Sequence, residues 1–287
     1  MTQQFSLGCA IWAYKEWVGD LYPKGSRAGD FLRLYSQRFH TVEGNTTFYS
    51  IPDAVTVARW HDETHADFSF CLKLPKTLTH AGLLVPRLTE TLTFLEQMQG
   101  LGDRLGPFFA QLPPGYAPDQ IADLETFLQA LPHSVMEFAL EVRHPAWFKE
   151  PHASRLTELL RSLQVARVLL DTRPIYDCPD DPQVHAERKK PRLPLQPSIT
   201  APFSLIRYIS HPDLELNQTY MDAWVQYVKT WLEQGTRIYF FVHCPVEARS
   251  PRNARHFYHL LQQAGATLPP LGWDQVEQPP AQLSLFE

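Results

Sequence analysis

Charged and hydrogen-bonding side chains recur where apolar segments of the 287-residue sequence end, and they could carry acid–base chemistry. The candidate catalytic residues are Glu43, Lys73, Glu141, Arg143 and Asp171. Carboxylates and amines transfer protons well when burial and neighbouring charges bring their pKa values near neutrality. If the protein is an enzyme, this set predicts hydrolase, lyase or isomerase chemistry.

A second group of aromatic, amide, imidazole and guanidinium side chains lies close to the first in the sequence and is predicted to bind the substrate. Its members are Trp12, Tyr14, Asn45, Phe48, Tyr49, His80, Gln111, His144, Trp147, Arg207 and His243. The aromatic rings could stack on bases or sugars, or could pack beneath loops. The two groups meet at residues 41–52, where Thr41, Glu43 and Asn45 share one strand face.

Several chemistries remain open for these residues. Glu43 and Glu141 could act as acid and base at a glycosidic bond, although the second and fifth strands of a barrel lie far apart. Lys73 could form a Schiff base, although nearby carboxylates would keep it charged. Glu43, Glu141, Asp171 and His243 could ligate a metal, but barrels that bind metals offer more such ligands, so no metal or cofactor is expected. Alternatively, the charges only form ion pairs that seal one end of the fold.

Strand-like and helical patterns alternate along the whole chain, and they must position these side chains. Strands are predicted at 5–11, from 41, and at 68–74, 107–112, 135–142, 166–170, 203–209 and 237–242. Helices are predicted at 29–38, 54–65, 89–99, 119–131, 153–163, 219–233 and 253–264. About eight strand–helix units predict an α/β fold, a single (β/α)8 TIM-type barrel over residues 1–267, whose site lies at the C-terminal ends of the strands.

Two segments interrupt this pattern. Residues 172–202 follow the sixth strand as a long loop rich in proline and charge, which is typical of a functional or disordered segment. The loop contains a basic run, Arg188-Lys189-Lys190-Pro191-Arg192, which could contact phosphate or simply be solvated. Residues 268–287 are proline-rich and are predicted to be a tail outside the barrel.

Composition limits the partners and the compartment. A formal net charge of −5 argues against an overall electrostatic attraction to nucleic acid or anionic membrane, although a local basic groove remains open. No apolar run approaches the roughly 20 residues that span a bilayer, and no secretory signal is visible. No membrane partner is therefore expected. The four cysteines show no close pairing, so a reducing cytoplasm is the expected compartment. The oligomeric state stays open.

Several motifs resemble the YecE-like family, domain of unknown function 72. The first is Gly8-Cys9-Ala10-Ile11-Trp12-Ala13-Tyr14, and the second runs from Phe39 to Tyr49 and includes Val42-Glu43-Gly44-Asn45. Further matches are Phe70, Lys73 and Thr79-His80, then Gly106-Pro107 and Gln111-Leu112-Pro113-Pro114, and Glu141-Val142-Arg143-His144 with Trp147. The resemblance implies a (β/α)8 barrel and a site location, but no reaction. The chain departs from the family pattern at Arg207-Tyr208-Ile209-Ser210-His211 and at Phe241-Val242-His243-Cys244-Pro245.

The last residues resemble the short peptide by which bacterial proteins dock on the replication sliding clamp. The match comprises Gln282, Leu283, Leu285 and Phe286, behind a proline-rich lead that could reach a groove. Leu285 and Phe286 could each contribute about 1.5–3 kcal/mol by burial. A tail that folds back onto its own barrel is the alternative.

Three functions are therefore compatible with the sequence. The first is processing or binding of nucleic acid, with recruitment to the sliding clamp by the tail. The second is a metabolic enzyme acting on a sugar-like or phosphorylated small molecule, and the third is a non-catalytic binding barrel or clamp adaptor. A basic groove lined by aromatic rings would favour the first, a deep pocket the second, and charges satisfied only by one another the third.

Overall fold

A computed structural model describes residues 4–184 and 189–276. Within them all eight predicted strands are present: β1 (Phe5–Cys9), β2 (Thr41–Gly44), β3 (Ser69–Leu72), β4 (Phe108–Gln111), β5 (Phe138–Glu141), β6 (Ala166–Asp171), β7 (Phe203–Ile209) and β8 (Arg237–His243). The helices are α1 (Phe31–Ser36), α2 (Thr46–Tyr49), α3 (Ala54–Asp62), α4 (Lys76–Thr79), α5 (Leu88–Met98), α6 (Ile121–Gln129), α7 (His152–Ser162), α8 (Gln218–Glu233), α9 (Ser250–Gln263) and α10 (Gly272–Gln275). Short 3-10 helices join them, including η6 (Pro145–Phe148) and η9 (Glu247–Arg249).

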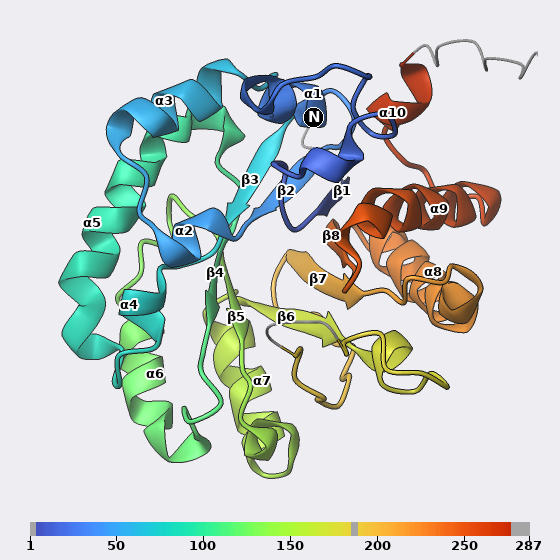
Figure 1. Ribbon diagram of the computed structural model, residues 1–287. Helices are drawn as coiled ribbons and strands as arrows, with labels where there is room; N and C mark the ends of the chain where they lie inside the picture. The colour runs from blue at the N-terminus through green and yellow to red at the C-terminus, as the bar shows by residue number, and fades with distance from the viewer. Residues whose placement is uncertain (1–3, 185–188, 277–287) are drawn as a thin grey trace, which may run out of the picture.

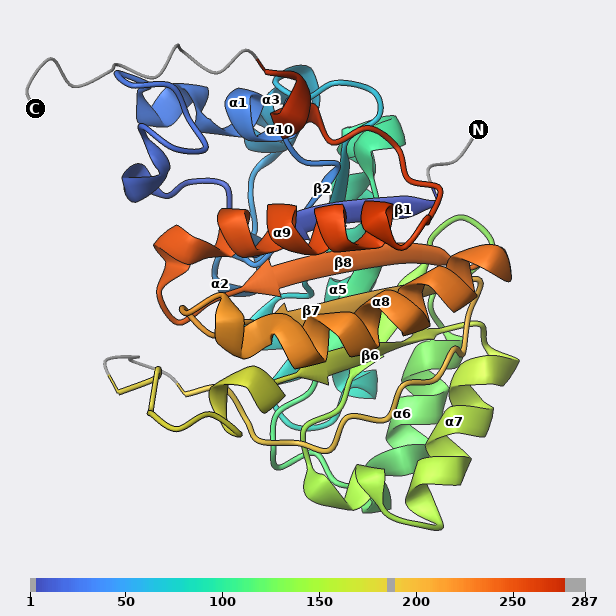
Figure 2. The same ribbon diagram turned by 90° about the vertical axis from the view of Figure 1, so that its right-hand side faces the viewer.

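The strands form parallel sheets at the centre of the molecule. Six of them make one sheet in the order β1-β8-β7-β6-β5-β4, and β2 pairs with β3 in a second sheet. Isolated parallel bridges join the two sheets at Phe70–Leu105 and Lys73–Phe109. The longer helices lie outside the strands (Figures 1 and 2). The fold is therefore α/β with a mostly parallel central sheet, as the alternating pattern predicts.

The boundary between β1 and β2 is held by a side chain in place of a regular ladder. The buried Tyr35 hydroxyl accepts a hydrogen bond from the Cys9 N–H (2.6 Å) and donates one to the Thr41 carbonyl (3.1 Å). Gly8 lies so close to this carbonyl that a Cβ there would be 1.9 Å from its oxygen. A glycine in this strand therefore allows the two backbones to approach each other.

The packed structure continues beyond residue 267, where the sequence predicts the start of a tail. Leu271 and Trp273 are buried, and the Trp273 ring packs edge-on against Phe39 at 6.0 Å between centroids. Gly272 packs so tightly on the Gln37 carbonyl that a Cβ would be 2.1 Å from it. Residues 268–276 thus fold back onto the domain. The candidate clamp-binding residues Gln282, Leu283, Leu285 and Phe286 lie outside the described residues.

In the described part of the chain, none of the helices combines the length and the apolar character that crossing a bilayer requires.

Candidate functional site

Strand alternation places a polar layer directly above an apolar one. Cys71, Phe109, Ala139, Leu205 and Phe241 belong to one buried apolar cluster, and each comes from a different strand. Two residues further along the same strands, on the same side, come Lys73, Gln111, Glu141, Arg207 and His243. Period-two geometry thus brings polar residues that are far apart in sequence to the C-terminal edge of the sheets.

Arg207 is the centre of the polar layer. Its Nε and Nη2 atoms donate to the two carboxylate oxygens of Glu43, each at 2.8 Å, and its Nη1 atom donates to Glu141 Oε2. All three residues are at most 2% exposed. The two carboxylates are therefore separated only by the width of one guanidinium group. The strands that hold Glu43 and Glu141 are not neighbours, as expected, but both side chains reach Arg207, so the distance between the strands does not keep the two carboxylates apart.

Glu43 is held as an anion by several donors. His243 Nε2 lies 2.8 Å from Oε2, and Asn45 Nδ2 donates to Oε1 at 2.6 Å. Burial by itself would raise the pKa of the Glu43 carboxyl. The nearby Arg207 and His243 have the larger, opposite effect and hold this pKa well below its usual range. Burial lowers the pKa of His243 to about 4 against the opposing effect of Glu43, so the imidazole is neutral and donates its Nε2 proton.

The other half of the layer joins Glu141 to Lys73 through Gln111. Arg143 donates to Glu141 Oε1 at 2.7 Å and to Gln111 Oε1 at 2.6 Å. Lys73 Nζ donates to the same Gln111 oxygen at 2.7 Å and lies 3.8 Å from the centroid of the Phe48 ring. Burial raises the pKa of Glu141, but Arg207, Arg143 and Lys73 together lower it to about 2.

Lys73 has an amine pKa close to neutrality. Burial is the main cause, and Arg207 and Arg143 add to it, so the pKa falls from 10.5 to about 7 despite the opposing effects of Glu141 and Glu43. The expectation that nearby carboxylates keep Lys73 charged is therefore wrong. An amine that is half neutral at pH 7 can act as a base or a nucleophile.

Two further titratable groups join the site, and neither is among the candidate site residues that the sequence predicts. The long loop brings in Lys190, whose pKa falls to about 8 through burial and the nearby Arg207. Glu247 in η9 has a pKa raised to about 8 by burial, and its Oε1 atom is buried without a hydrogen-bond partner among the described residues. In the sequence, only the basic run 188–192 pointed to Lys190, and no motif pointed to Glu247.

Asp171 lies outside the polar layer. Its carboxylate accepts hydrogen bonds from Arg173 Nε (2.9 Å) and Nη2 (2.8 Å) and from Trp224 Nε1 (2.8 Å), a residue of α8. Asp171 follows Leu170 by one position, so its side chain points to the helix side of the strand. The structure gives it a role in anchoring α8 to β6.

Most of the predicted aromatic residues pack beneath loops. Trp147 is fully buried and donates to the Tyr116 carbonyl at 2.9 Å. The Trp12 ring packs edge-on against Trp60 at 5.3 Å, and Tyr14 packs against Trp17 at 5.5 Å. Tyr49 differs, because it is 67% exposed. These residues therefore do not form a row of rings that could stack on bases.

The two predicted histidines beside the strands have different environments. His80 packs on the Phe48 ring at 5.2 Å, and burial, followed by Lys73, lowers its pKa to about 4. His144 Nδ1 accepts a hydrogen bond from the Ala146 N–H at 3.2 Å and so caps η6. His80 thus belongs to the site, whereas His144 is engaged in local structure.

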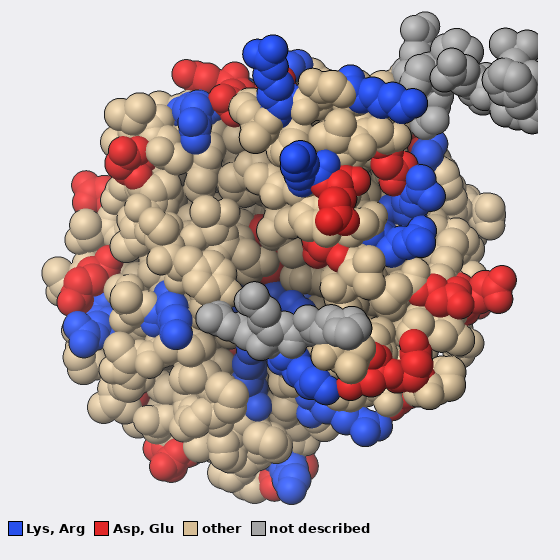
Figure 3. Space-filling view, viewed as in Figure 1, with Lys and Arg blue, Asp and Glu red and all other residues tan. Residues whose placement is uncertain are grey.

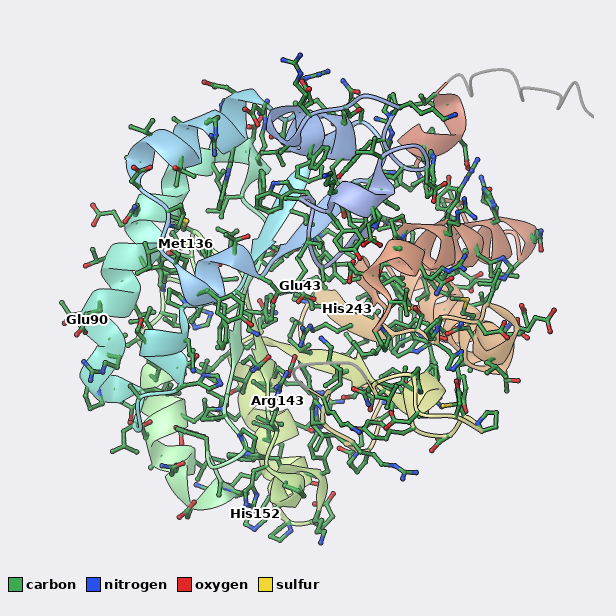
Figure 4. All side chains as sticks on the ribbon, in the orientation of Figure 1. Glu43, Glu90, Met136, Arg143, His152 and His243 are labelled. Atoms are coloured by element: carbon green, nitrogen blue, oxygen red, sulfur yellow. The ribbon has the colours of Figure 1, made fainter. Side chains whose placement is uncertain are left out.

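The arrangement is seen from outside in Figures 3 and 4. The labelled Glu43, His243 and Arg143 lie near the middle of this face, whereas Glu90 and His152 lie at its periphery. Acidic and basic atoms are visible in the hollow at the centre of the space-filling view. The labelled residues of the charged layer therefore lie behind the hollow of this face.

Metal ligation is a poor fit to the groups that could provide it. Glu43 and Glu141 both bind Arg207, and His243 is hydrogen-bonded to Glu43. A cation there would therefore have to displace a guanidinium group. Cys178, Asp180 and His211 offer ligand atoms within 4.8 Å of one another.

The ring of His211 argues against a metal at that second cluster. Its Nδ1 accepts a hydrogen bond from the Asp213 N–H at 2.9 Å, so the proton resides on Nε2, which lies 3.0 Å from Asp180 Oδ1. The nitrogen that faces the cluster is therefore protonated, whereas a metal ligand needs a free lone pair there.

The comparisons with known proteins agree with the arrangement of strands and helices. A model of the family described as "Protein of unknown function DUF72" matches residues 6–280. The chain is 34% identical over 284 residues to the UPF0759 protein YecE of Escherichia coli K12, covering 98% of this chain and 99% of that protein. Solved structures of DUF72 family proteins from Thermotoga maritima MSB8 and Enterococcus faecalis V583 superpose with TM-scores of 0.68. The Thermotoga protein is 20% identical, and the match covers 90% of this chain and 99% of that one. The Enterococcus protein is 18% identical, and the match covers 91% of this chain and 98% of that one.

Proposed function

This chain belongs to the DUF72 family, and we propose that its polar layer is the active site of an acid–base enzyme acting on a small anionic substrate. The scaffold of this proposal is a (β/α)8-type barrel, in which β2 and β3 complete the ring begun by the six-stranded sheet. Enzymes of that architecture place their sites at the C-terminal ends of the strands. The substrate class is a sugar-like or other small molecule that carries a carboxylate or a phosphate group.

The charge balance of the layer supports an anionic substrate. Two guanidinium groups balance the two carboxylates, and the nearby histidines are neutral because their pKa values lie near 4. Lys190 and the protonated fraction of Lys73 then remain without a counter-charge, and the pKa of each lysine is lowered by burial and by Arg207. An anion that bound here would neutralise this excess positive charge.

The single observation that carries the proposal is the environment of Lys73. The amine is 5% exposed and donates to Gln111, and its pKa of about 7 leaves a large neutral fraction at physiological pH. Strongly perturbed lysines of this kind cluster at functional sites, because catalysis needs groups whose pKa values match the reaction. Lys73 is therefore proposed to accept a proton from the substrate, while Arg143 and Lys190 bind its anionic group.

The experiment detects proton abstraction in a way that does not require the substrate to be identified first. Small ketones, sugars and organic acids that carry phosphate or carboxylate groups are incubated with the protein in deuterated buffer, and deuterium uptake at carbon is measured by mass spectrometry. We expect uptake with the wild-type protein and with Lys76→Met, whose residue is exposed on α4, but not with Lys73→Met. Uptake that Lys73→Met retains, or no uptake with any compound, would contradict the proposal.

Nucleic acid is the second candidate, because a phosphodiester would suit the same excess of positive charge. The predicted stacking residues favour the small molecule, since Trp147 and Phe48 are buried and the partly buried Trp12 packs on Trp60. If the protein bound single-stranded oligonucleotides and Lys73→Met weakened that binding, nucleic acid would become the favoured substrate.

Docking on the sliding clamp stays a prediction from the sequence of the tail. The expected result is micromolar binding of the full-length protein to purified bacterial clamp, measured by surface plasmon resonance, and its loss in a Leu285→Ala/Phe286→Ala double variant. The buried apolar area that the two side chains would provide is the physical reason. If the intact protein does not bind, the clamp hypothesis is wrong, and the proposal for the polar layer is unaffected.

A further inference from the structure

A groove of about 310 Å³ lies on the outside of the fold, between α7 and the extended segment 196–198. This segment belongs to the long connection between β6 and β7, which runs past β6 towards α7 (Figure 2). Gln196 Nε2 donates to the Phe148 carbonyl at 3.0 Å, and Arg161 Nε donates to the Ile199 carbonyl at 3.4 Å. Both ends of the segment are thus fastened to the neighbouring elements, and the groove has defined walls.

A buried arginine without a counter-ion forms part of the groove. Arg167 is 4% exposed, and its Nη2 atom has no hydrogen-bond partner among the described residues. The guanidinium group lies 5.1 Å from the centroid of the Phe148 ring, a contact that leaves Nη2 without a hydrogen-bond acceptor. Because β6 alternates, this side chain points to the helix side, away from Val168 and the polar layer.

The contrast with Arg207 shows what is missing at Arg167. Arg207 is similarly buried, but it donates to two carboxylates. Burial alone shifts the pKa of Arg167, lowering it to about 10, and no neighbouring carboxylate among the described residues opposes the effect. A buried cation is costly unless it is paired. The cost is explained if a ligand that arrives from solution supplies the negative charge.

The rest of the groove offers further donors to an oxyanion. Ser198 Oγ is buried and has no hydrogen-bond partner in the described residues, and Arg161 and Ser154 also line the groove. The lining includes two carboxylates, Glu150 and Glu158, but both residues are exposed beside or on α7. Hydroxyl groups and a planar guanidinium are the groups that bind phosphate in proteins.

We propose that this groove is a second binding site, which takes the phosphate group of a small phosphorylated ligand on Arg167, Arg161 and Ser198. The guanidinium group of Arg167 supplies paired N–H donors, and Ser198 Oγ supplies a neutral one. A volume of this size holds a phosphate group with a small organic body. The site shares no residue with the polar layer, so it stands whether or not Lys73 is catalytic.

The test is calorimetric titration of the full-length protein with inorganic phosphate and with pyrophosphate at low ionic strength. We expect binding to wild type, and binding at least about tenfold weaker to Arg167→Met, because hydrogen bonds to charged groups contribute about 1.5–3 kcal/mol. Arg155→Met removes an exposed arginine of the same helix α7 and should leave the affinity unchanged. Lys73→Met reports any phosphate that binds at the polar layer, and the binding that this variant retains belongs to the groove.

A second variant keeps the test decisive if Arg167→Met does not fold. Ser198→Asp places a negative charge in a partly exposed segment of the groove and should weaken phosphate binding by a similar factor. Equal affinity in wild type and Ser198→Asp would overturn the proposal. So would loss of binding in Lys73→Met alone, or no binding by wild type up to about 10 mM, which corresponds to a negligible affinity.

Discussion

Arg207→Met is expected to lower the free energy of unfolding by about 3–5 kcal/mol at pH 7, the range measured when one partner of a buried ion pair is removed. The variant would leave the carboxylates of Glu43 and Glu141 buried without the guanidinium group that both of them contact. Urea unfolding followed by circular dichroism gives the difference directly.

The pH dependence of this loss gives a second signature. In wild type the pKa of Glu141 is lowered to about 2 and that of Glu43 is also lowered, so these carboxylates stabilise the fold above their unfolded pKa of about 4.3. That stability is lost as pH falls through the folded pKa values. Without Arg207, burial raises both pKa values, so the deficit of the variant should be largest at pH 7 and shrink towards pH 4.

The matched control is Arg252→Met, which removes an exposed partner of Asp20 at 2.7 Å. A surface pair of this kind contributes about 0–1 kcal/mol, so little change is expected. A loss in Arg207→Met no larger than in the control would show that the polar layer does not depend on its central guanidinium group.

Lys73→Met is expected to raise the free energy of unfolding by about 1–4 kcal/mol at pH 6, as happens when a buried charge is replaced by an apolar side chain of similar size. The pKa of Lys73 is about 7 in the folded protein, against about 10.4 in an unfolded chain. Below pH 7 both states are protonated and the fold bears the full cost of the buried charge. As pH rises from about 7 to about 10 this cost disappears, so the advantage of the variant should vanish over the same range.

Lys76→Met serves as the control, because this lysine is exposed and its removal should change stability by less than about 0.5 kcal/mol. A Lys73→Met variant that is less stable than wild type at pH 6 would identify Lys73 as a structural ion-pair partner. A more stable variant without deuterium exchange would show the trade-off between stability and activity that functional sites display.

The sequence predicts the order of strands and helices because apolar periodicity is local. A strand repeats every two residues and a helix every 3.6, so each element is visible in its own segment. Glu43, Lys73, Gln111 and Glu141 could be predicted for the same reason, since parallel strands place their C-terminal ends on one edge. The resemblance to the YecE-like family in the motifs around Glu43 and Glu141 is confirmed by the family match.

The face on which each side chain lies required the tertiary structure. Each face of β6 contributes to a buried apolar cluster, Val168 on one side and Leu169 on the other, so the sequence alone could not tell whether Leu170 or Asp171 points towards the polar layer. For the same reason the sequence could not place Arg167. This residue lies on the same face of β6 as Asp171, and it lines the groove beside α7.

Electrostatic properties also required the folded molecule. The pKa of Lys73 depends on how deeply it is buried and on its distances to Arg207 and Glu141, and none of these is encoded by neighbours along the chain. The entry of Lys190 and Glu247 into the site likewise depends on how the long loop and η9 pack over the strand ends. The sequence therefore determined which elements form and which residues end them, whereas only tertiary packing decided which charges meet and what their protonation states are.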